Sequence, residues 1–356
     1  MTKTKQIHTV AGLMSGTSLD GLDIALCRFK KANKGYKFKI LAAQTIPYSA
    51  ALKNKLKKAY FSKAVDFVKL NQEFGSYLGE SVNKFLNANK FKADAISSHG
   101  HTIFHQPKLG YTTQIGCGAS IAAATKTTTV CDLRSLDVAL KGQGAPLVPI
   151  GDKLLFSKYD SCLNLGGIAN ISFDKKGERI AFDICICNMI LNFLAEKKGK
   201  AFDTNGKFAA SGKVNKDLLK KLNALPYYKI KGSRTLGFED FEKQLLPFLR
   251  TKTTTKDLLA TFTEHIAQQI AYIINVNNLQ TVLVTGGGTF NSHLIALIKQ
   301  KTKCKVVIPT KTIVNFKEAI IFAFLGYLRL HHKTNTLKTV TGANANSIGG
   351  AVYLMS

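Results

Sequence analysis

The sequence predicts an α/β protein built of two domains, and three observations support this. The chain has 356 residues, more than the roughly 250–300 at which a single hydrophobic core stops growing. Apolar residues make up 45% and charged residues 20% of the chain, as in globular rather than disordered proteins. Apolar strands followed by glycine turns and then by helices recur along it, which is typical of α/β folds with ligands at strand ends.

The first half begins with two predicted strands, Val10–Met14 and Ile24–Phe29, joined by the glycine- and serine-rich segment Ser15–Asp23. Two helices follow. In the second, one helical stripe contains Phe67, Phe74, Leu78, Val82 and Phe85. Residues 93–97 then predict a buried strand, which ends in the polar loop Ser98-His99-Gly100-His101.

The second half repeats this beginning, because Ser161–Phe173 again consists of an apolar strand, a glycine pair and an apolar strand. An amphipathic helix follows, with its apolar face formed by Leu258, Leu259, Phe262, Ile266, Ile270 and Ile273. It leads into the strand Thr281–Val284 and another glycine turn. We therefore expect domains at 1–155 and 156–356, and leave open whether the last helix packs back on the first domain.

The net charge is +28, from 50 basic and 22 acidic side chains. Such an excess first suggests a polyanion such as nucleic acid. However, lysines are scattered through every segment and only six of the basic residues are arginines, whereas nucleic-acid readers rely on clustered arginines and stacked aromatics. The pattern favours a lysine-rich surface without a nucleic-acid partner, one that would attract a phosphate-bearing small ligand.

The seven cysteines show no disulfide-like spacing, which is typical of a reducing compartment. No signal-peptide-like stretch opens the sequence. The uncharged segment 265–298 is interrupted by glutamines, asparagines and glycines, so it does not predict a membrane span. We expect a cytoplasmic protein with no membrane partner.

Three glycine-rich turns carry the functional signal: residues 15–21, 165–170 and 286–291. Glycine lets backbone N–H groups approach phosphate oxygens closely, although each turn alone is more often an ordinary tight turn. None is a Walker P-loop or a G-x-G-x-x-G fingerprint. Together they resemble the actin-like, sugar-kinase and heat-shock ATPase superfamily, in which hairpins from two domains clamp phosphates and a glycine turn holds adenosine.

The segment Gly12-Leu-Met-Ser-Gly-Thr-Ser-Leu-Asp-Gly-Leu-Asp23 resembles the signature of anhydro-N-acetylmuramic acid kinases, which act in peptidoglycan recycling. The resemblance continues over the whole chain at residues 98–105, 113–116, 132–134, 142–149, 164–170, 182–183, 209–212, 285–288, 317–319 and 342–350. It implies two actin-like (ribonuclease H-like) domains flanking a central cleft for ATP and substrate, with the first phosphate hairpin in the N-terminal domain and the second phosphate hairpin, the catalytic Asp and the adenosine turn in the C-terminal one.

The family transfers phosphate from ATP to O6 of 1,6-anhydro-N-acetylmuramic acid while water opens the anhydro ring. The products are N-acetylmuramic acid 6-phosphate and ADP. Asp183 matches the catalytic Asp of the family and would activate the water. From the residues alone, without the resemblance, an Asp that ends a strand and caps the next helix is the favoured interpretation.

The resemblance also implies binding residues. The nucleotide would be bound by Gly16, Thr17, Ser18, Leu19, Asp20, Gly21, Leu22, Asp23, Gly166, Gly167, Gly286, Gly287, Gly288 and Asn291. Magnesium would be ordered, through water, by Asp20, with Asp23 as a further candidate. The sugar would be contacted by His99, Gln143, Asn188 and Glu318, although Glu318 also suits a simple helix N-terminus. A homodimer is implied as well.

The chain departs from the family pattern after Asp183, where it reads Ile184-Cys185-Ile186-Cys187-Asn188 while many relatives read Thr-Gly-Pro-Gly-Asn. Cys185 and Cys187, with His99, His101 and His105, suggest a metal site, but their spacing is not that of zinc ligands, which favours buried thiols and a polar sugar-binding loop. Two alternatives for function stay open: a kinase of another amino sugar, and a non-catalytic ATP- or polyanion-binding protein.

Overall fold

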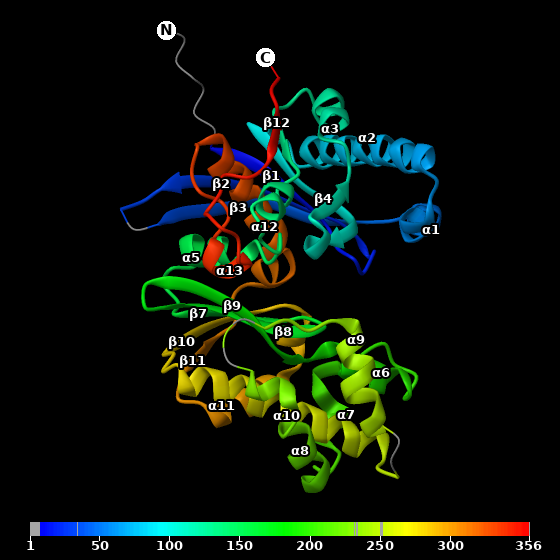
Figure 1. Ribbon diagram of the computed structural model, residues 1–356, viewed down its shortest axis with the longest axis vertical. Helices are drawn as coiled ribbons and strands as arrows, with labels where there is room; N and C mark the ends of the chain where they lie inside the picture. Colours follow the sequence, from blue (N-terminus) through cyan, green and yellow to red (C-terminus); the bar gives the residue numbers. More distant parts are fainter. Residues whose placement is uncertain (1–7, 34, 231, 233, 250–251, 356) are drawn as a thin grey trace. The chain divides into compact units, whose positions relative to one another are not determined.

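The chain folds into two compact units in the computed structural model, which describes residues 8–33, 35–230, 232, 234–249 and 252–355 (Figure 1). Unit 1 comprises Met1–Leu155 and Phe316–Ser356, and unit 2 comprises Phe156–Asn315. The first division coincides with the expected domain boundary after residue 155. The C-terminal segment from Phe316 onward, which we placed in the second domain, groups with unit 1.

The sheet of unit 1 has the order β12-β6-β4-β1-β2-β3, with β5 paired to β4. Its strands are β1 (Thr9–Ser15), β2 (Gly21–Lys31), β3 (Tyr36–Pro47), β4 (Ala95–Gln106), β5 (Tyr111–Ile115), β6 (Thr129–Cys131) and β12 (Ala351–Tyr353). β1 runs antiparallel to β2 and parallel to β4. The polar segment Ser98–His101, expected as a loop, continues strand β4 instead, because it pairs with β1 on one side and β5 on the other.

The sheet of unit 2 has the order β11-β10-β7-β8-β9. Its strands are β7 (Ser161–Leu165), β8 (Ile168–Lys175), β9 (Glu178–Ile186), β10 (Thr281–Thr285) and β11 (Lys305–Val307). β7 is antiparallel to β8 and parallel to β10, just as β1 is to β2 and β4. Both sheets therefore join a three-stranded meander to parallel strands through their first strand. This repeated topology confirms the expected α/β class of two actin-like, ribonuclease H-like units.

Helices cover both sheets. The α-helices are α1 (Ala50–Lys58), α2 (Ala64–Ala88), α3 (Gly118–Thr125), α4 (Ser135–Ala139), α5 (Val148–Leu155), α6 (Asn188–Glu196), α7 (Lys207–Ala210), α8 (Lys216–Asn223), α9 (Phe238–Asp240), α10 (Thr255–Val276), α11 (Ser292–Lys301), α12 (Lys311–Leu330) and α13 (Lys338–Thr341). Short 3-10 or π turns are η1 (Ala59–Phe61), η2 (Pro107–Leu109), η3 (Thr204–Gly206), η4 (Pro226–Lys229), η5 (Phe241–Leu245), η6 (Leu246–Leu249) and η7 (Gly287–Phe290). Within the described residues, no helix has both the length and the apolar character needed to cross a bilayer.

Each unit has its own hydrophobic core. In unit 2 the core lies between the sheet and α10, whose predicted apolar face is buried as expected; α10 and α11 lie along one side of this sheet in Figure 1. In unit 1, α2 buries Phe74, Leu78, Val82 and Phe85 against the sheet, and Phe67 packs at the edge of the same cluster. The predicted stripe of α2 is confirmed.

Helix α12 approaches the first strand of unit 1 unusually closely. A Cβ atom on Gly12 would lie 2.0 Å from the backbone oxygen of Ala319 and 2.5 Å from the backbone nitrogen of Ala323. Real Cβ contacts are never that short, so only glycine allows α12 to rest on β1. This contact fixes Glu318, one residue before Ala319, beside the strand that leads into the first glycine turn.

We predict that Gly12→Ala lowers the free energy of unfolding by about 3 kcal/mol, because the new methyl group must push α12 away from β1. Gly110→Ala is the control: a Cβ there meets nothing within 4 Å, and only the positive φ of +85° costs about 1 kcal/mol. Urea titration of both variants measures the difference. Equal losses would contradict a special role for Gly12.

Candidate active site

The Gly166–Gly167 turn between β7 and β8 is tied to the start of helix α6. Backbone N–H groups of three consecutive residues donate to the turn: Cys187 and Met189 to the Gly167 oxygen at 2.8 and 3.1 Å, and Asn188 to the Gly166 oxygen at 3.1 Å. The side chain of Asn188 adds a bond from Nδ2 to the Leu165 oxygen at 2.8 Å. Asn188, expected at the sugar, thus braces the turn of the β7–β8 hairpin.

The third glycine turn packs against the same hairpin, since β10 lies parallel to β7. Gly286 has a φ of +85°, and a Cβ on it would lie 2.5 Å from Oδ1 of Asn164. A Cβ on Gly288 would lie 2.7 Å from the Cβ of Leu165. At Gly287, by contrast, the nearest atom to such a Cβ is Nδ2 of Asn188, at 3.9 Å. Residues 164–167, 187–189 and 286–288 thus form one backbone cradle, open at Gly287.

Asn291, the last predicted nucleotide-binding residue, follows this turn. Its side-chain Oδ1 accepts a hydrogen bond from the Leu294 N–H at 3.0 Å and caps helix α11. The side chain therefore orients the helix that begins directly after the glycine turn.

Asp183 lies inside strand β9, opposite Asn170, rather than after a strand that ends at Phe182. The register shifts just beyond it, where Ile184 is the extra residue of a β-bulge. β9 is the edge strand of its sheet, and the backbone N–H of Asp183 donates to the Arg234 oxygen, outside the sheet, at 3.0 Å. Helix α6 has no side-chain cap, so the interpretation of Asp183 as a helix cap is wrong.

A later segment of unit 2 surrounds Asp183. Oδ2 accepts the Leu236 N–H at 2.9 Å, and the backbone oxygen of Asp183 accepts bonds from the Tyr227 hydroxyl at 2.6 Å and from Nε of Arg234 at 3.2 Å. Burial raises the pKa of Asp183, while the Leu236 N–H and the Arg234 charge act to lower it. Sequence reasoning missed these partners, because they follow the strand by more than forty residues. The one signal in the sequence was that arginine is rare in this chain, which makes Arg234 conspicuous.

The four residues that replace the family's Gly-Pro turn, Ile184 to Cys187, are at most 5% exposed and belong to the core of unit 2. Burial raises the pKa of both thiols among them. In this protein the segment is thus part of the core packing of unit 2, and Asp183 and Asn188 lie on either side of it.

In unit 1, the turn between β1 and β2 exposes Thr17, Ser18 and Asp20 to solvent and buries Leu19, which has a positive φ of 58°. Gly16 and Gly21 flank these residues, and a Cβ on Gly21 would lie 2.5 Å from the Ile46 oxygen. Leu22, which follows Gly21 on β2, is fully buried. The turn is thus anchored by apolar packing and presents hydroxyl and carboxylate groups outward.

Asp23, on β2, accepts a hydrogen bond from Oγ1 of Thr45 at 2.5 Å. Desolvation raises the pKa of Asp23, the Thr45 bond lowers it, and the negative charge of Asp20 raises it further. The two carboxylates therefore repel one another, and a bound cation would relieve the repulsion.

His99, on β4, is buried and linked to Arg134. Nε of Arg134 donates to Nε2 of His99 at 2.9 Å, so the ring proton is on Nδ1, which donates to the Gly100 oxygen at 3.0 Å. Burial, together with the Arg134 charge, lowers the pKa of His99 to about 3. His99 is neutral at physiological pH and holds the guanidinium in place.

Arg134 also connects two further candidates. Its Nη1 donates to the Gly144 oxygen at 2.5 Å, which orders the loop that carries the exposed Gln143. Its charge also acts on Glu318, whose side chain is accessible: desolvation by the surrounding protein raises the pKa of that carboxyl, and Arg134 and Lys317 lower it. In unit 1, Arg134 thus bonds His99 and the backbone beside Gln143, and its charge reaches Glu318.

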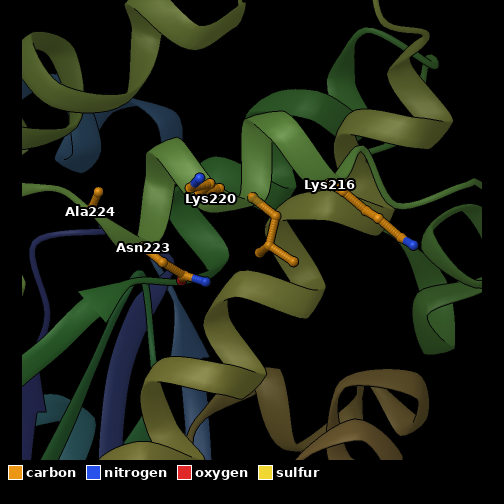
Figure 2. A pocket seen from close by; sticks show the side chains of 5 residues that line it. Lys216, Lys220, Asn223 and Ala224 are labelled. Carbon is orange, nitrogen blue, oxygen red and sulfur yellow. The ribbon is translucent and has the colours of Figure 1, made fainter.

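Two other features fall outside these networks. A surface hollow is lined by Lys216, Leu219, Lys220 and Asn223 of α8 and by Ala224, which follows the helix (Figure 2); none of these was a site candidate. The histidines and cysteines considered as metal ligands are divided between β4 in unit 1 and β9 in unit 2. In the described ranges, no three His, Cys, Asp or Glu side chains gather as a metal cluster.

Two units of the same α/β topology, each with a glycine turn after its first strand, are typical of the actin-like fold class, which includes ATPases and sugar kinases. Within this class the chain belongs to the anhydro-N-acetylmuramic acid kinase family, whose model matches residues 8–355. The resemblance found in the sequence is confirmed, and with it the enzyme class, a phosphotransferase with an alcohol group as acceptor.

Among curated relatives, the anhydro-N-acetylmuramic acid kinase of Francisella tularensis subsp. novicida is 34% identical, over 96% of this chain and 97% of the relative. That of Photobacterium profundum is 33% identical, over 98% and 99%. Among solved structures, component A of the (R)-2-hydroxyglutaryl-CoA dehydratase of Acidaminococcus fermentans is similar with a TM-score of 0.48 and 12% identity, over 91% of this chain and 99% of that one.

The neutral state of His99 predicts acid sensitivity. The folded protein binds no proton there until about pH 3, whereas an unfolded histidine binds one near pH 6.5. Stability is therefore lost as the pH falls between these values, by about 1 kcal/mol per pH unit from this residue. Between pH 6.5 and 4, the free energy of unfolding should fall less steeply in His99→Gln than in the parent protein, as measured by urea titration at each pH. His332 is exposed, so His332→Gln is the control and should follow the parent. Parallel slopes for all three proteins would disprove the prediction.

Proposed function

We propose that this protein transfers the γ-phosphoryl group of ATP to O6 of 1,6-anhydro-N-acetylmuramic acid while water opens the anhydro ring. The products are N-acetylmuramic acid 6-phosphate and ADP, as in the recycling of peptidoglycan amino sugars. Membership of the family supports the reaction, and the environment of Asp183 is the observation that carries the mechanism.

In the anhydro sugar O6 is a bridging ether oxygen with no proton to lose. It becomes a phosphoryl acceptor when its bond to the anomeric carbon breaks, so a water molecule must supply a new bond to that carbon. In the balanced step, the water oxygen bonds to C1, the C1–O6 bond breaks, O6 bonds to the γ-phosphorus and ADP leaves. The one proton released by the water needs a base.

Asp183 has the properties of that base. Oδ2 is anchored by the Leu236 N–H, and in the part of the chain that the structure describes Oδ1 accepts no bond from a protein donor. Partial burial raises the pKa of the carboxyl, which makes it a stronger base than a fully hydrated aspartate. We assign it the role of removing the water proton at Oδ1.

The nucleotide is assigned to the glycine turns. In unit 2, the cradle of Gly166, Gly167 and Gly286–Gly288 is kept free of side chains, because a Cβ at Gly286 or Gly288 would collide with the hairpin. In unit 1, the exposed turn that contains Gly16, Thr17 and Ser18 offers backbone N–H and hydroxyl donors, which suit phosphate oxygens. The family's use of residues 16–23 and Asn291 supports the same assignment.

Magnesium fits the carboxylates of Asp20 and Asp23, whose mutual repulsion a divalent cation would neutralise. When bound, the ion supplies positive charge to the phosphates. For the sugar we assign Glu318, Gln143 and His99, with His99 acting through Arg134, and Asn188 as the residue that holds the phosphate hairpin.

Isotopically labelled water tests the reaction. Incubation with the anhydro sugar, magnesium ATP and H₂¹⁸O should give a 6-phosphorylated product with one ¹⁸O at the anomeric hydroxyl and none in the phosphate, read by mass spectrometry. Because anomeric oxygen exchanges slowly with solvent, the product incubated alone in H₂¹⁸O is the control. Phosphorylation of non-anhydro N-acetylmuramic acid at a comparable rate would favour an ordinary sugar kinase.

We predict that Asp183→Asn lowers kcat by about 1,000-fold or more and leaves ATP binding unchanged, because Asn keeps the acceptor for Leu236 and loses the basic oxygen. ADP release and calorimetric titration with ATP measure the two effects. Asp174→Asn, on the neighbouring strand β8, is the control and should retain activity. Near-parental turnover in Asp183→Asn would remove Asp183 from the mechanism.

A further inference from the structure

Arg234 makes an unusual set of contacts around Asp183. Its guanidinium donates to three backbone oxygens: Nε to Asp183 at 3.2 Å, and Nη1 to Ile230 at 3.1 Å and to Tyr227 at 3.5 Å. Its own backbone oxygen accepts the Asp183 N–H at 3.0 Å. One residue therefore holds the backbone of Asp183 on both its N–H and its carbonyl side, directly before the β-bulge at which the register of β9 against β8 shifts.

The charge of Arg234 is nearly enclosed. The side chain is 9% exposed and lies over the rings of Phe182 at 5.3 Å and Tyr227 at 4.9 Å. Among the described residues no carboxylate forms an ion pair with it within 4 Å, and its hydrogen-bond acceptors are neutral carbonyls. Burying a cation without an anionic partner is costly. Hydrogen bonds to backbone oxygens therefore do not by themselves explain why an arginine is buried at this position.

The aromatic neighbours of Arg234 are themselves fixed. Tyr227 donates to the Asp183 oxygen, while the adjacent Tyr228 bonds Nε2 of His265 at 2.8 Å, and Nδ1 of His265 lies 2.7 Å from Oδ1 of Asn223. His265 lies on helix α10, and because it is buried its pKa is lowered to about 3. Its ring therefore remains neutral, and so do its hydrogen bonds to Tyr228 and Asn223. Turn η4 is thereby attached to the core on one side and to Asp183 on the other.

We propose that Arg234 is a positioning residue for the water-activating carboxylate: it fixes the backbone of Asp183 on both sides and places a positive charge next to this residue. The inference rests on the proposed function of Asp183. The nearby cation lowers the proton affinity that burial would otherwise give the carboxylate, and the neutral acceptors leave the charge of Arg234 available to Asp183.

Three variants separate charge, geometry and folding. Arg234→Met removes the charge and the hydrogen bonds, so we expect kcat to fall about 100-fold and the acid limb of the kcat/KM pH profile to move up by about one unit. Arg234→Lys keeps the charge and loses the planar fork; kcat should fall about 10-fold with the acid limb unmoved. The control Arg179→Met replaces an equally buried arginine of β9, which bonds Ser172 and Asp174, and should leave the acid limb in place.

A second readout does not depend on catalysis. The Asp183 carboxyl carbon can be titrated by ¹³C NMR in the substrate-free protein, with Asp183→Asn to assign the signal. Its pKa should be higher in Arg234→Met than in the parent, and unchanged in Arg179→Met. If Arg234→Met does not fold, loss of kcat in Arg234→Lys with an unmoved acid limb tests the positioning role alone.

These outcomes distinguish the two proposals. An active Asp183→Asn enzyme would overturn the proposed base, whatever Arg234 does. An inactive Asp183→Asn enzyme, together with Arg234→Met and Arg234→Lys variants that keep the parental kcat and the parental Asp183 titration, would overturn the role of Arg234 only. A loss of stability in Arg234→Met with no change in either titration would make this arginine merely structural.

Discussion

Much of unit 2 depends on one constraint: two glycine carbonyls accept the N–H groups of three consecutive residues. The bonds from Cys187, Asn188 and Met189 to Gly166 and Gly167 join the turn of one hairpin to the beginning of helix α6. The first N–H groups of a helix have no partner within it, and the hairpin supplies one. Since β9 ends directly before this junction, the position of Asp183 relative to the glycine cradle is set by the same bonds.

The sequence predicted the parts of this arrangement that are local. The glycine turns, the buried strands beside them and the amphipathic helix α10 follow from residue patterns a few positions long. It missed that β4 continues through Ser98–His101, because polar side chains on a strand paired on both sides look like a loop. It also missed Arg234 and Tyr227, because their contacts with Asp183 depend on how distant segments meet.

Ile184–Cys187, which differ from the Gly-Pro sequence of many relatives, are core residues of unit 2 in this protein. The apolar residues are buried in the core, and the register of β9 against β8 shifts at Ile184. The proposed mechanism requires only that Asp183 and Asn188 keep their places on either side of this segment. The backbone between them can be rebuilt with other residues, provided that both ends keep their hydrogen bonds to Arg234 and to Leu165.

Two opposing effects act on Asp183, and a general base needs both. Burial raises the pKa and so increases the affinity of the carboxylate for a proton, while the Leu236 N–H and the Arg234 charge limit the rise. A base whose pKa rises too far is protonated before the reaction begins, and one that is fully stabilised as an anion does not accept a proton. Arg234, which is enclosed and bonds neutral acceptors, partly offsets the rise in pKa that burial causes. It does so without forming a direct ion pair with the carboxylate. The same balance is what the proposed role requires of a carboxylate that lies partly buried inside a strand.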